Sequence, residues 1–110
     1  MRHAFLLTML LSLSAAAETD LEKGAKLLHA RKFDEARETY ERILSAEPKS
    51  VEAHVRLCRL YAEQLDDIDK AIEHGEAAIR IAPSDASAHF ALGEAYGLKA
   101  ADVGVFSAFS

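Results

Sequence analysis

Apolar and polar residues follow each other along the chain with the spacing of amphipathic helices, and two prolines interrupt this pattern at matching places. The stretches ERILSAEPKSVEAH (41–54) and AAIRIAPSDASAH (77–89) each close one helical run at a proline and open another before an Ala-His pair. Proline lacks the backbone donor and disfavours helix in the residue before it, so Pro48 and Pro83 are predicted to end helices. The next helices are predicted to begin near Ser50 and near Ser84 or Asp85, because such side chains suit a helix N-terminus.

The composition favours helices throughout. Half of the 110 residues are apolar and 28% are charged, which is typical of one globular domain with a modest core. Alanine, leucine, glutamate, lysine and arginine dominate, β-branched residues are scarce, and there is no tryptophan or asparagine. Most of these abundant residues are strong helix formers, so we expect an all-α fold.

The first 17 residues have the pattern of a secretory signal peptide. Arg2 precedes an apolar run over residues 4–13, and Ala15, Ala16 and Ala17 offer a cleavage site of small residues. We therefore predict cleavage after Ala17 and a periplasmic or secreted mature protein. The apolar run is shorter than the roughly 20 residues that a membrane-spanning helix needs, so no stable membrane span is expected in the mature chain.

The charge of the chain narrows the class of partner. The formal net charge is −5, and cleavage would remove Arg2 and leave 12 of the 13 basic residues against 18 acidic ones. A chain of this charge is not expected to bind nucleic acid or an anionic membrane. Cys58 is the only cysteine, so no internal disulfide can form, and we expect stability to come from helix packing.

The chain aligns with itself at a spacing of 34 to 35 residues. Small residues coincide at Gly24, Cys58 and Gly93, and one extra residue in the second copy falls where a turn between helices is expected. The other landmarks coincide in the same way: Leu27 with Tyr61 and Tyr96, Ala36 with Ala71, Ile43 with Ala78, and Pro48 with Pro83. Tyr40 is the aromatic landmark of the first copy. Together with the run HFALGEAY (89–96), these landmarks resemble the tetratricopeptide repeat, a helix-turn-helix unit of about 34 residues.

The resemblance implies an all-α solenoid of about two and a half repeats. After the signal peptide (1–17), the first repeat is predicted over residues 18–50, the second over 51–85, and the first helix of a third, with an apolar tail, over 86–110. The small landmark residues would let the two helices of a repeat approach closely where they cross. Gly75 stands where the first copy has Tyr40, which predicts that the second repeat is the softer one. Arg31 and Leu65 are assigned to the turn where the family often has glycine.

The pattern of a second helix is missing after Tyr96. The rest of the chain lacks the alanine, aromatic and proline landmarks, and its last eight residues carry Val103, Val105, Phe106 and Phe109. Two interpretations stay open. The sequence is a fragment of a longer array, or the chain covers the exposed face of its last helix by self-association through this apolar tail.

In tetratricopeptide repeats the first helices line a concave groove that typically binds an extended or helical peptide, and this implies where a partner would bind here. The lining positions transfer to Leu21, Val55, Arg56, Arg59, Phe90 and Glu94. The lysine and asparagine with which some members clamp a carboxylate terminus are absent from these positions. Arg56 and Arg59 can pair either with an acidic or carboxylate-bearing ligand or with Glu52 and Glu63, one helical turn away.

No combination of residues typical of catalysis or cofactor binding stands out. No two of His29, His54, His74 and His89 lie three or four residues apart, as metal ligands on one helix face would, and Cys58 is expected to be buried at a helix crossing. We therefore expect a non-catalytic protein-interaction scaffold without metal or cofactor. The alternative is a helical accessory segment of a longer enzyme or envelope-assembly protein whose active part lies beyond Ser110.

Overall fold

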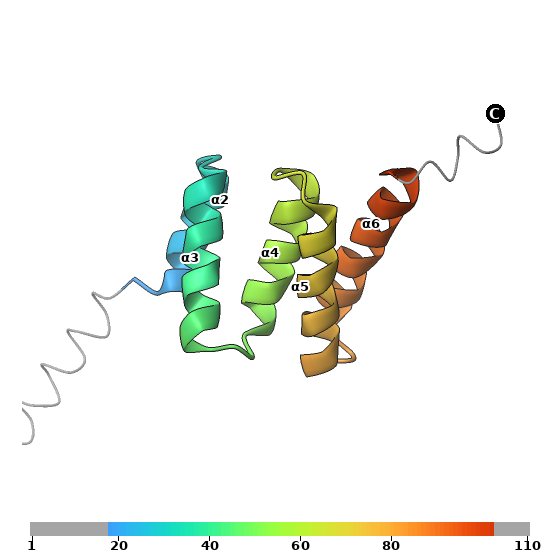
Figure 1. Ribbon diagram of the computed structural model, residues 1–110. Coiled ribbons are helices and arrows are strands. Elements are labelled where there is room, and N and C mark those ends of the chain that lie inside the picture. Colours follow the sequence, from blue (N-terminus) through green and yellow to red (C-terminus); the bar gives the residue numbers. More distant parts are fainter. Residues whose placement is uncertain (1–17, 103–110) are drawn as a thin grey trace, which may run out of the picture.

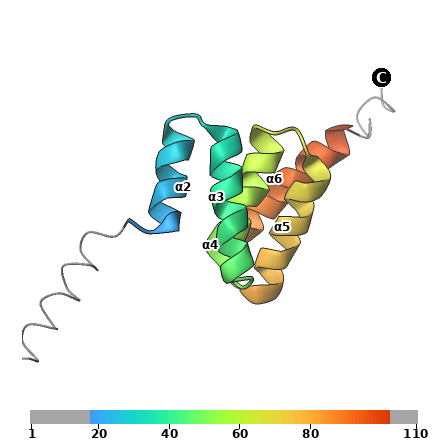
Figure 2. The same cartoon turned by 60° about the vertical axis from the view of Figure 1, so that its left-hand side comes forward.

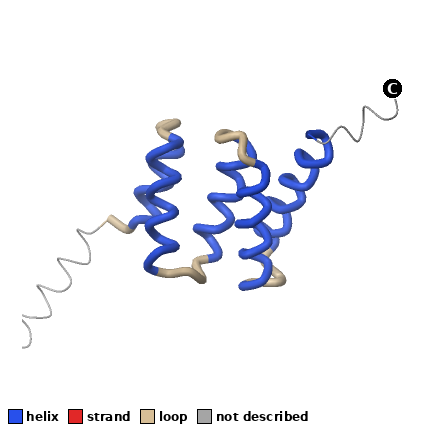
Figure 3. Tube along the Cα trace, in the orientation of Figure 1, coloured by secondary structure: helices blue, strands red, loops and turns tan. Residues whose placement is uncertain are grey.

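The computed structural model describes residues 18–102, which contain five helices and no strand (Figures 1 and 3). The predicted signal peptide and the apolar tail that begins at Val103 lie outside these residues. In chain order the helices are α2 (Asp20–His29), α3 (Phe33–Ala46), α4 (Val51–Glu63), α5 (Ile68–Ile81) and α6 (Ala86–Asp102). The all-α prediction is confirmed.

The helices form two antiparallel hairpins and one further helix. α2 packs on α3, α4 packs on α5, and α6 packs against both α4 and α5. The hairpins are joined through contacts between α3 and α4, so the elements follow one another in a row, as Figure 1 shows and Figure 2 shows from another side. This arrangement is that of a helical-repeat solenoid.

Polar side chains fix the beginning of most helices. Backbone N–H groups of the first turn donate hydrogen bonds of 2.9–3.3 Å to the side chains of Thr19, Ser50, Asp67 and Asp85. These contacts satisfy amide groups that have no partner within the helix. The predicted starts after the two prolines are confirmed, because Ser50 caps α4 and Asp85 precedes the first residue of α6.

The interior consists mostly of small side chains. Six alanines are completely buried, and the largest fully buried side chains are those of Tyr40, Leu57 and Cys58. The six alanines are Ala36, Ala53, Ala71, Ala78, Ala88 and Ala95. Small residues let helix axes come close together, so the core is thin and depends on close contact between backbones.

The side chains that fill the space at the helix crossing differ between the two hairpins. In the first, a Cβ atom at Gly24 would lie 2.7 Å from Cζ of Tyr40, so the tyrosine ring occupies the space that the glycine leaves. In the second, Cys58 faces Gly75, where a Cβ atom would lie 3.1 Å from Sγ of Cys58. Leu92 of α6 also approaches Gly75, with Cδ1 at 3.0 Å from that position. The space of the absent aromatic ring is therefore shared by Cys58 and Leu92.

The turns within the hairpins differ by one residue. Residues 30–32 connect α2 to α3, and residues 64–67 connect α4 to α5. One residue in each turn has a positive φ, namely Arg31 at 60° and Asp66 at 52°. Arg31 and Leu65 both lie in these turns, as predicted, and the extra residue of the second turn puts its left-handed position at Asp66, a residue type that tolerates it.

The face of α6 that carries Gly93, the third of the small landmark residues, is open. Within the described part of the chain, no atom other than those of α6 itself and of neighbouring residues comes within 4 Å of a Cβ atom built at Gly93 or Gly97. Tyr96 on the same helix is 47% exposed. Gly93 is thus not at a crossing of paired helices in residues 18–102, unlike Gly24 and Cys58.

Candidate partner-binding site

Two arginines on the outward side of α4 are the most accessible charged groups among the predicted groove residues. Nη2 of Arg56 lies 4.0 Å from Oε1 of Glu52, and Nη2 of Arg59 lies 3.5 Å from Oε1 of Glu63. The two arginine side chains remain 42% and 45% exposed. Ion pairs of this length and exposure contribute only about 0–1 kcal/mol to stability, so a ligand carboxylate can replace them at little cost.

Shallow clefts flank these arginines on both sides. One, of about 270 Å³, lies between the hairpins and is lined by Leu28, Phe33 and Leu60 besides the arginines. The other, of about 420 Å³, lies between α4 and the start of α6 and includes Val55 and Ser87. Arg56 and Arg59 line both clefts and therefore stand on the ridge between them.

Phe90 adds an exposed aromatic ring to this region. Its side chain is 64% exposed, and the Cζ atom of Arg59 lies 5.9 Å from its ring centroid, within the range of a cation–π contact. We call the surface formed by Arg56, Arg59 and Phe90 the arginine surface. Val55, in contrast, is only 8% exposed, so its side chain belongs mainly to the core and offers little surface to a partner.

A pair of carboxyl groups borders the arginine surface. Oε1 of Glu94 on α6 is buried and has no hydrogen-bond partner among the described residues. The neighbouring carboxyl of Glu63 raises the pKa of Glu94 by hydrogen bonding, burial raises it further, and Arg59 opposes the shift. Two carboxyl groups thus lie close together at this edge of the surface, which favours a neutral or positively charged neighbour there.

Leu21 lies apart from the other predicted groove residues. It is half-buried and lines a cleft with Ile43 and Glu47, between the start of α2 and the end of α3. The structure therefore brings Arg56, Arg59, Phe90 and Glu94 together around α4 and α6 and leaves Leu21 outside this group.

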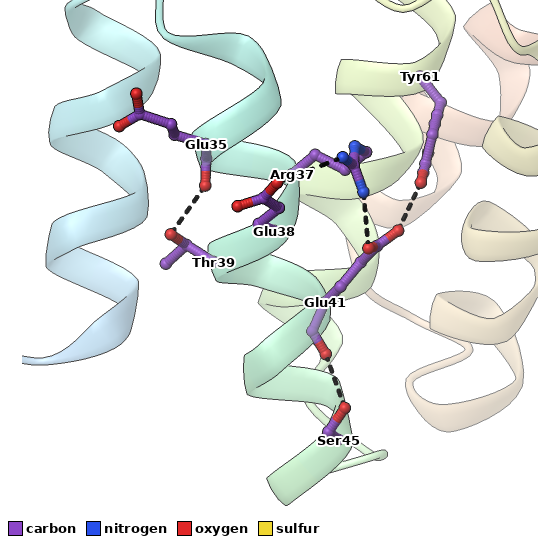
Figure 4. Close-up of polar contacts among 7 residues, drawn as sticks. All are labelled: Glu35, Arg37, Glu38, Thr39, Glu41, Ser45 and Tyr61. Atoms are coloured by element: carbon purple, nitrogen blue, oxygen red, sulfur yellow. Dashed lines mark hydrogen bonds and ion pairs between the residues drawn. The ribbon is translucent and has the colours of Figure 1, made fainter.

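Polar contacts between successive repeats were not predicted from the sequence. The hydroxyl of Tyr61 on α4 donates to Oε1 of Glu41 on α3 at 2.5 Å, and Nη1 of Arg37 donates to Oε2 of the same carboxylate at 2.9 Å (Figure 4). The contact recurs 35 residues later, where the hydroxyl of Tyr96 donates to Oε1 of Glu76 at 2.8 Å. Burial and then the hydrogen bond to Glu41 raise the pKa of Tyr61 to about 12.

Histidines make a second recurring contact at the proline positions. Nε2 of His54 lies 3.0 Å from the carbonyl oxygen of Pro48, and Nε2 of His89 lies 2.6 Å from that of Pro83. The sequence held a signal for both kinds of contact, because His54 and His89 have the same spacing as Glu41 and Glu76. These bonds tie the start of each new repeat to the end of the previous one.

The structure assigns Cys58 to packing. Its side chain is completely buried, and this burial raises the pKa of the thiol to about 11, so it is a poor nucleophile at neutral pH. In residues 18–102 no group of three or more histidine, cysteine, aspartate or glutamate side chains is placed to hold a metal ion. None of the helices in this range is both long and apolar enough to cross a membrane.

Comparison with known families agrees with the geometry. A family model described as Tetratricopeptide repeat matches residues 21–86, which is more than half of the chain. The chain belongs to the tetratricopeptide-repeat family. Repeats of this family generally mediate protein–protein interactions and are typically non-catalytic. No curated protein matches this tetratricopeptide-repeat chain.

Proposed function

We propose that this tetratricopeptide-repeat chain is an exported protein-interaction module that binds an acidic or carboxylate-bearing segment of a partner at the arginine surface. The observation that carries the proposal is the placement of Arg56 and Arg59 on a ridge between two clefts, each half-exposed and only weakly paired. A guanidinium group can hold a carboxylate through two parallel hydrogen bonds, while the exposed ring of Phe90 offers apolar contact beside it.

Charge reversal at the arginine surface tests this site. The double variant Arg56→Glu and Arg59→Glu should lose the partner that the unchanged chain captures from an envelope extract, and direct binding of that purified partner should weaken at least tenfold. The matched control is Arg42→Glu with Arg80→Glu, which makes the same charge change at exposed positions on the second helices α3 and α5. Equal binding by the two double variants would refute the proposed surface.

Export is a separate part of the proposal and rests on the pattern of residues 1–17. We propose a periplasmic or secreted location with a mature chain that starts at Glu18. Expression of the full chain in a bacterial host, followed by fractionation and intact-mass measurement, should yield the shortened chain outside the cytoplasm. A full-length chain found only in the cytoplasm would contradict this part and leave the arginine surface unaffected.

The open face of α6 favours a second candidate function. Gly93 and Gly97 offer a surface on which another helix could pack closely, as α3 packs at Gly24 and α5 at Cys58. Under this alternative the described helices are an accessory segment of a longer enzyme or envelope-assembly protein. The complete reading frame at this locus decides between the two.

Self-association through residues 103–110 is a further prediction, which sedimentation velocity of chains with and without that tail tests.

A further inference from the structure

Two histidines that are 20 residues apart in the sequence meet within the second hairpin. Nδ1 of His54 on α4 lies 3.1 Å from Nδ1 of His74 on α5. On its other side, the His54 ring contacts the carbonyl oxygen of Pro48 through Nε2 at 3.0 Å. Both side chains are half-buried. The pair therefore connects α4 to α5 and also to the segment that joins the first repeat to the second.

These contacts determine where the protons lie. A carbonyl oxygen only accepts, so Nε2 of His54 must carry a proton and donate it to Pro48. In neutral His54 the Nδ1 atom is then a bare acceptor, and the 3.1 Å contact requires that Nδ1 of His74 donate to it. His74 is thereby held as the Nδ1–H tautomer, while its Nε2 atom is the free acceptor.

The pair can accept only one additional proton without losing its contact. A proton on Nε2 of His74 leaves the bond between the two Nδ1 atoms in place. A further proton on Nδ1 of His54 would set two N–H groups against each other at a distance where one must move away. In the unfolded chain both imidazoles are free to be charged, so acid favours states in which the pair is broken.

The surroundings of His74 lower the pKa of its imidazole. The ring of Tyr61 on α4 stacks on His74 with centroids 5.8 Å apart, and burial is the main cause that lowers the pKa of His74. His54 lowers this pKa further, and so does Lys70 at the start of α5, whose Nζ lies 5.4 Å from the ring of Tyr61.

Negative groups near the pair only partly offset this effect. Glu41 on α3 and Glu73 on α5 both act to raise the pKa of His74, yet its net direction is downward. The carboxylate of Glu41 accepts hydrogen bonds from Arg37 and Tyr61, and within residues 18–102 it forms no ion pair with either histidine.

We propose that His54 and His74 form an acid-sensitive joint, which holds α4, α5 and the Pro48 segment together through one shared proton and opens when both imidazoles are charged. The second hairpin is then the part of the array that loosens on acidification. The first hairpin has no such pair among the described residues, since its one histidine, His29, lies exposed at the end of α2. The proposal is independent of what binds at the arginine surface.

Nitrogen NMR of the imidazole rings in the full chain tests the tautomers directly. At about pH 7.5 we expect His74 as the Nδ1–H form, which is the less common form in water, and His54 as the Nε2–H form. Independent titration of both histidines near the ordinary value of about 6.5, each as the Nε2–H form, would overturn the proposal.

Amide hydrogen exchange tests the consequence for the hairpin. After correction for intrinsic rates, the opening constants of α5 amides should rise about tenfold per pH unit below about pH 6 for each proton that the closed pair cannot bind. The variant His74→Gln keeps a donor for His54 but cannot be charged, so it should remove this pH dependence. The control His89→Gln should retain it, because His89 bonds to Pro83 but has no second histidine beside it among the described residues. Unchanged acid sensitivity in His74→Gln would refute the joint.

Discussion

The hydroxyl of Tyr61 reaches across the boundary between the two repeats and donates to the carboxylate of Glu41 at 2.5 Å, a carboxylate that Arg37 also binds. Tyr61 is 4% exposed and the Glu41 side chain is 41% exposed, so this polar contact is partly buried at the edge of the core. A hydrogen bond between a buried hydroxyl and an ionised group is among the stronger ones in a protein. The boundary between the repeats therefore depends on polar contacts, this one and that of His54 with Pro48, as well as on apolar packing.

Replacing Tyr61 by phenylalanine should lower the free energy of unfolding by about 1 kcal/mol, because the bond to Oε1 of Glu41 is lost while Arg37 still donates to Oε2. Urea denaturation followed by circular dichroism measures the change. The matched variant Tyr96→Phe removes the equivalent bond to Glu76 from a side chain that is 47% exposed. We expect less than about 0.5 kcal/mol there, and equal losses in the two variants would argue against the role of burial.

Replacing glycine by alanine should have opposite effects on stability at two equivalent landmark positions, Gly24 and Gly93. Gly24→Ala should destabilise the chain by about 1–3 kcal/mol, because the new Cβ atom would press on the buried ring of Tyr40. Gly93→Ala should stabilise it by about 0.5–1 kcal/mol, since alanine favours the helix and the site is open. Thermal and urea unfolding of both variants check these signs. A loss of stability in Gly93→Ala would show that a segment outside residues 18–102 covers that face.

The thiol of Cys58 should be protected from modification in the folded chain. With a pKa of about 11 and complete burial, its reactive thiolate is both scarce and inaccessible at neutral pH. Labelling with a thiol-reactive dye should be at least about a hundredfold slower in buffer than in urea, and its rate should report the opening of the second hairpin. Labelling at the same rate in both conditions would mean that the thiol is not at the crossing of α4 and α5.

Replacing Glu94 by glutamine should stabilise the chain at neutral pH. The pKa of Glu94 is raised in the folded state, so its favourable contribution is present below the unfolded pKa and is lost as the pH rises through the folded pKa. At pH 7 the ionised carboxylate lies beside Glu63, whereas glutamine can donate to that group. We expect a gain of about 0.5 kcal/mol for this partly exposed pair, and a smaller one at pH 4.

Denaturation midpoints at the two pH values measure this gain. The variant Glu38→Gln makes the same charge change on the exposed side of α3 and serves as the control. A gain in Glu94→Gln that does not differ between the two pH values would mean that the proximity of Glu63 is not its cause.

The sequence predicted the helices and their order because the strongest signals are local. Pro48 and Pro83 end helical runs, Ser50 and Asp85 cap the following helices, and Gly24 and Cys58 each lie where the two helices of their own hairpin cross. The prediction that the second repeat is the softer one stays a prediction. The structure shows that Cys58 and Leu92 occupy the space beside Gly75.

The contacts that escaped prediction depend on which faces of different helices meet. Tyr61 was identified only as a repeat landmark, and predicting its bond to Glu41 requires knowing how α4 lies against α3. His54 and His74 sit on separate helices, so spacing along one helix could not reveal their contact. The left-handed residue of the second turn, Asp66, was not predicted, because self-alignment locates an inserted residue only to within a turn. For the same reason, the depth of Val55 and the separation of Leu21 from the arginine surface became visible only in the structure.

The bonds between repeats bear on how such an array can grow. Glu41 and Tyr61 are followed 35 residues later by Glu76 and Tyr96, and Pro48 and His54 by Pro83 and His89. A block of 35 residues that begins anywhere in this series carries a complete set of donors and acceptors. Tandem duplication of that block in the gene would therefore create a new junction with its hydrogen bonds already matched. Lengthening the protein by one unit would require no compensating mutation, and shortening it by one unit would leave no donor or acceptor at the junction without its counterpart.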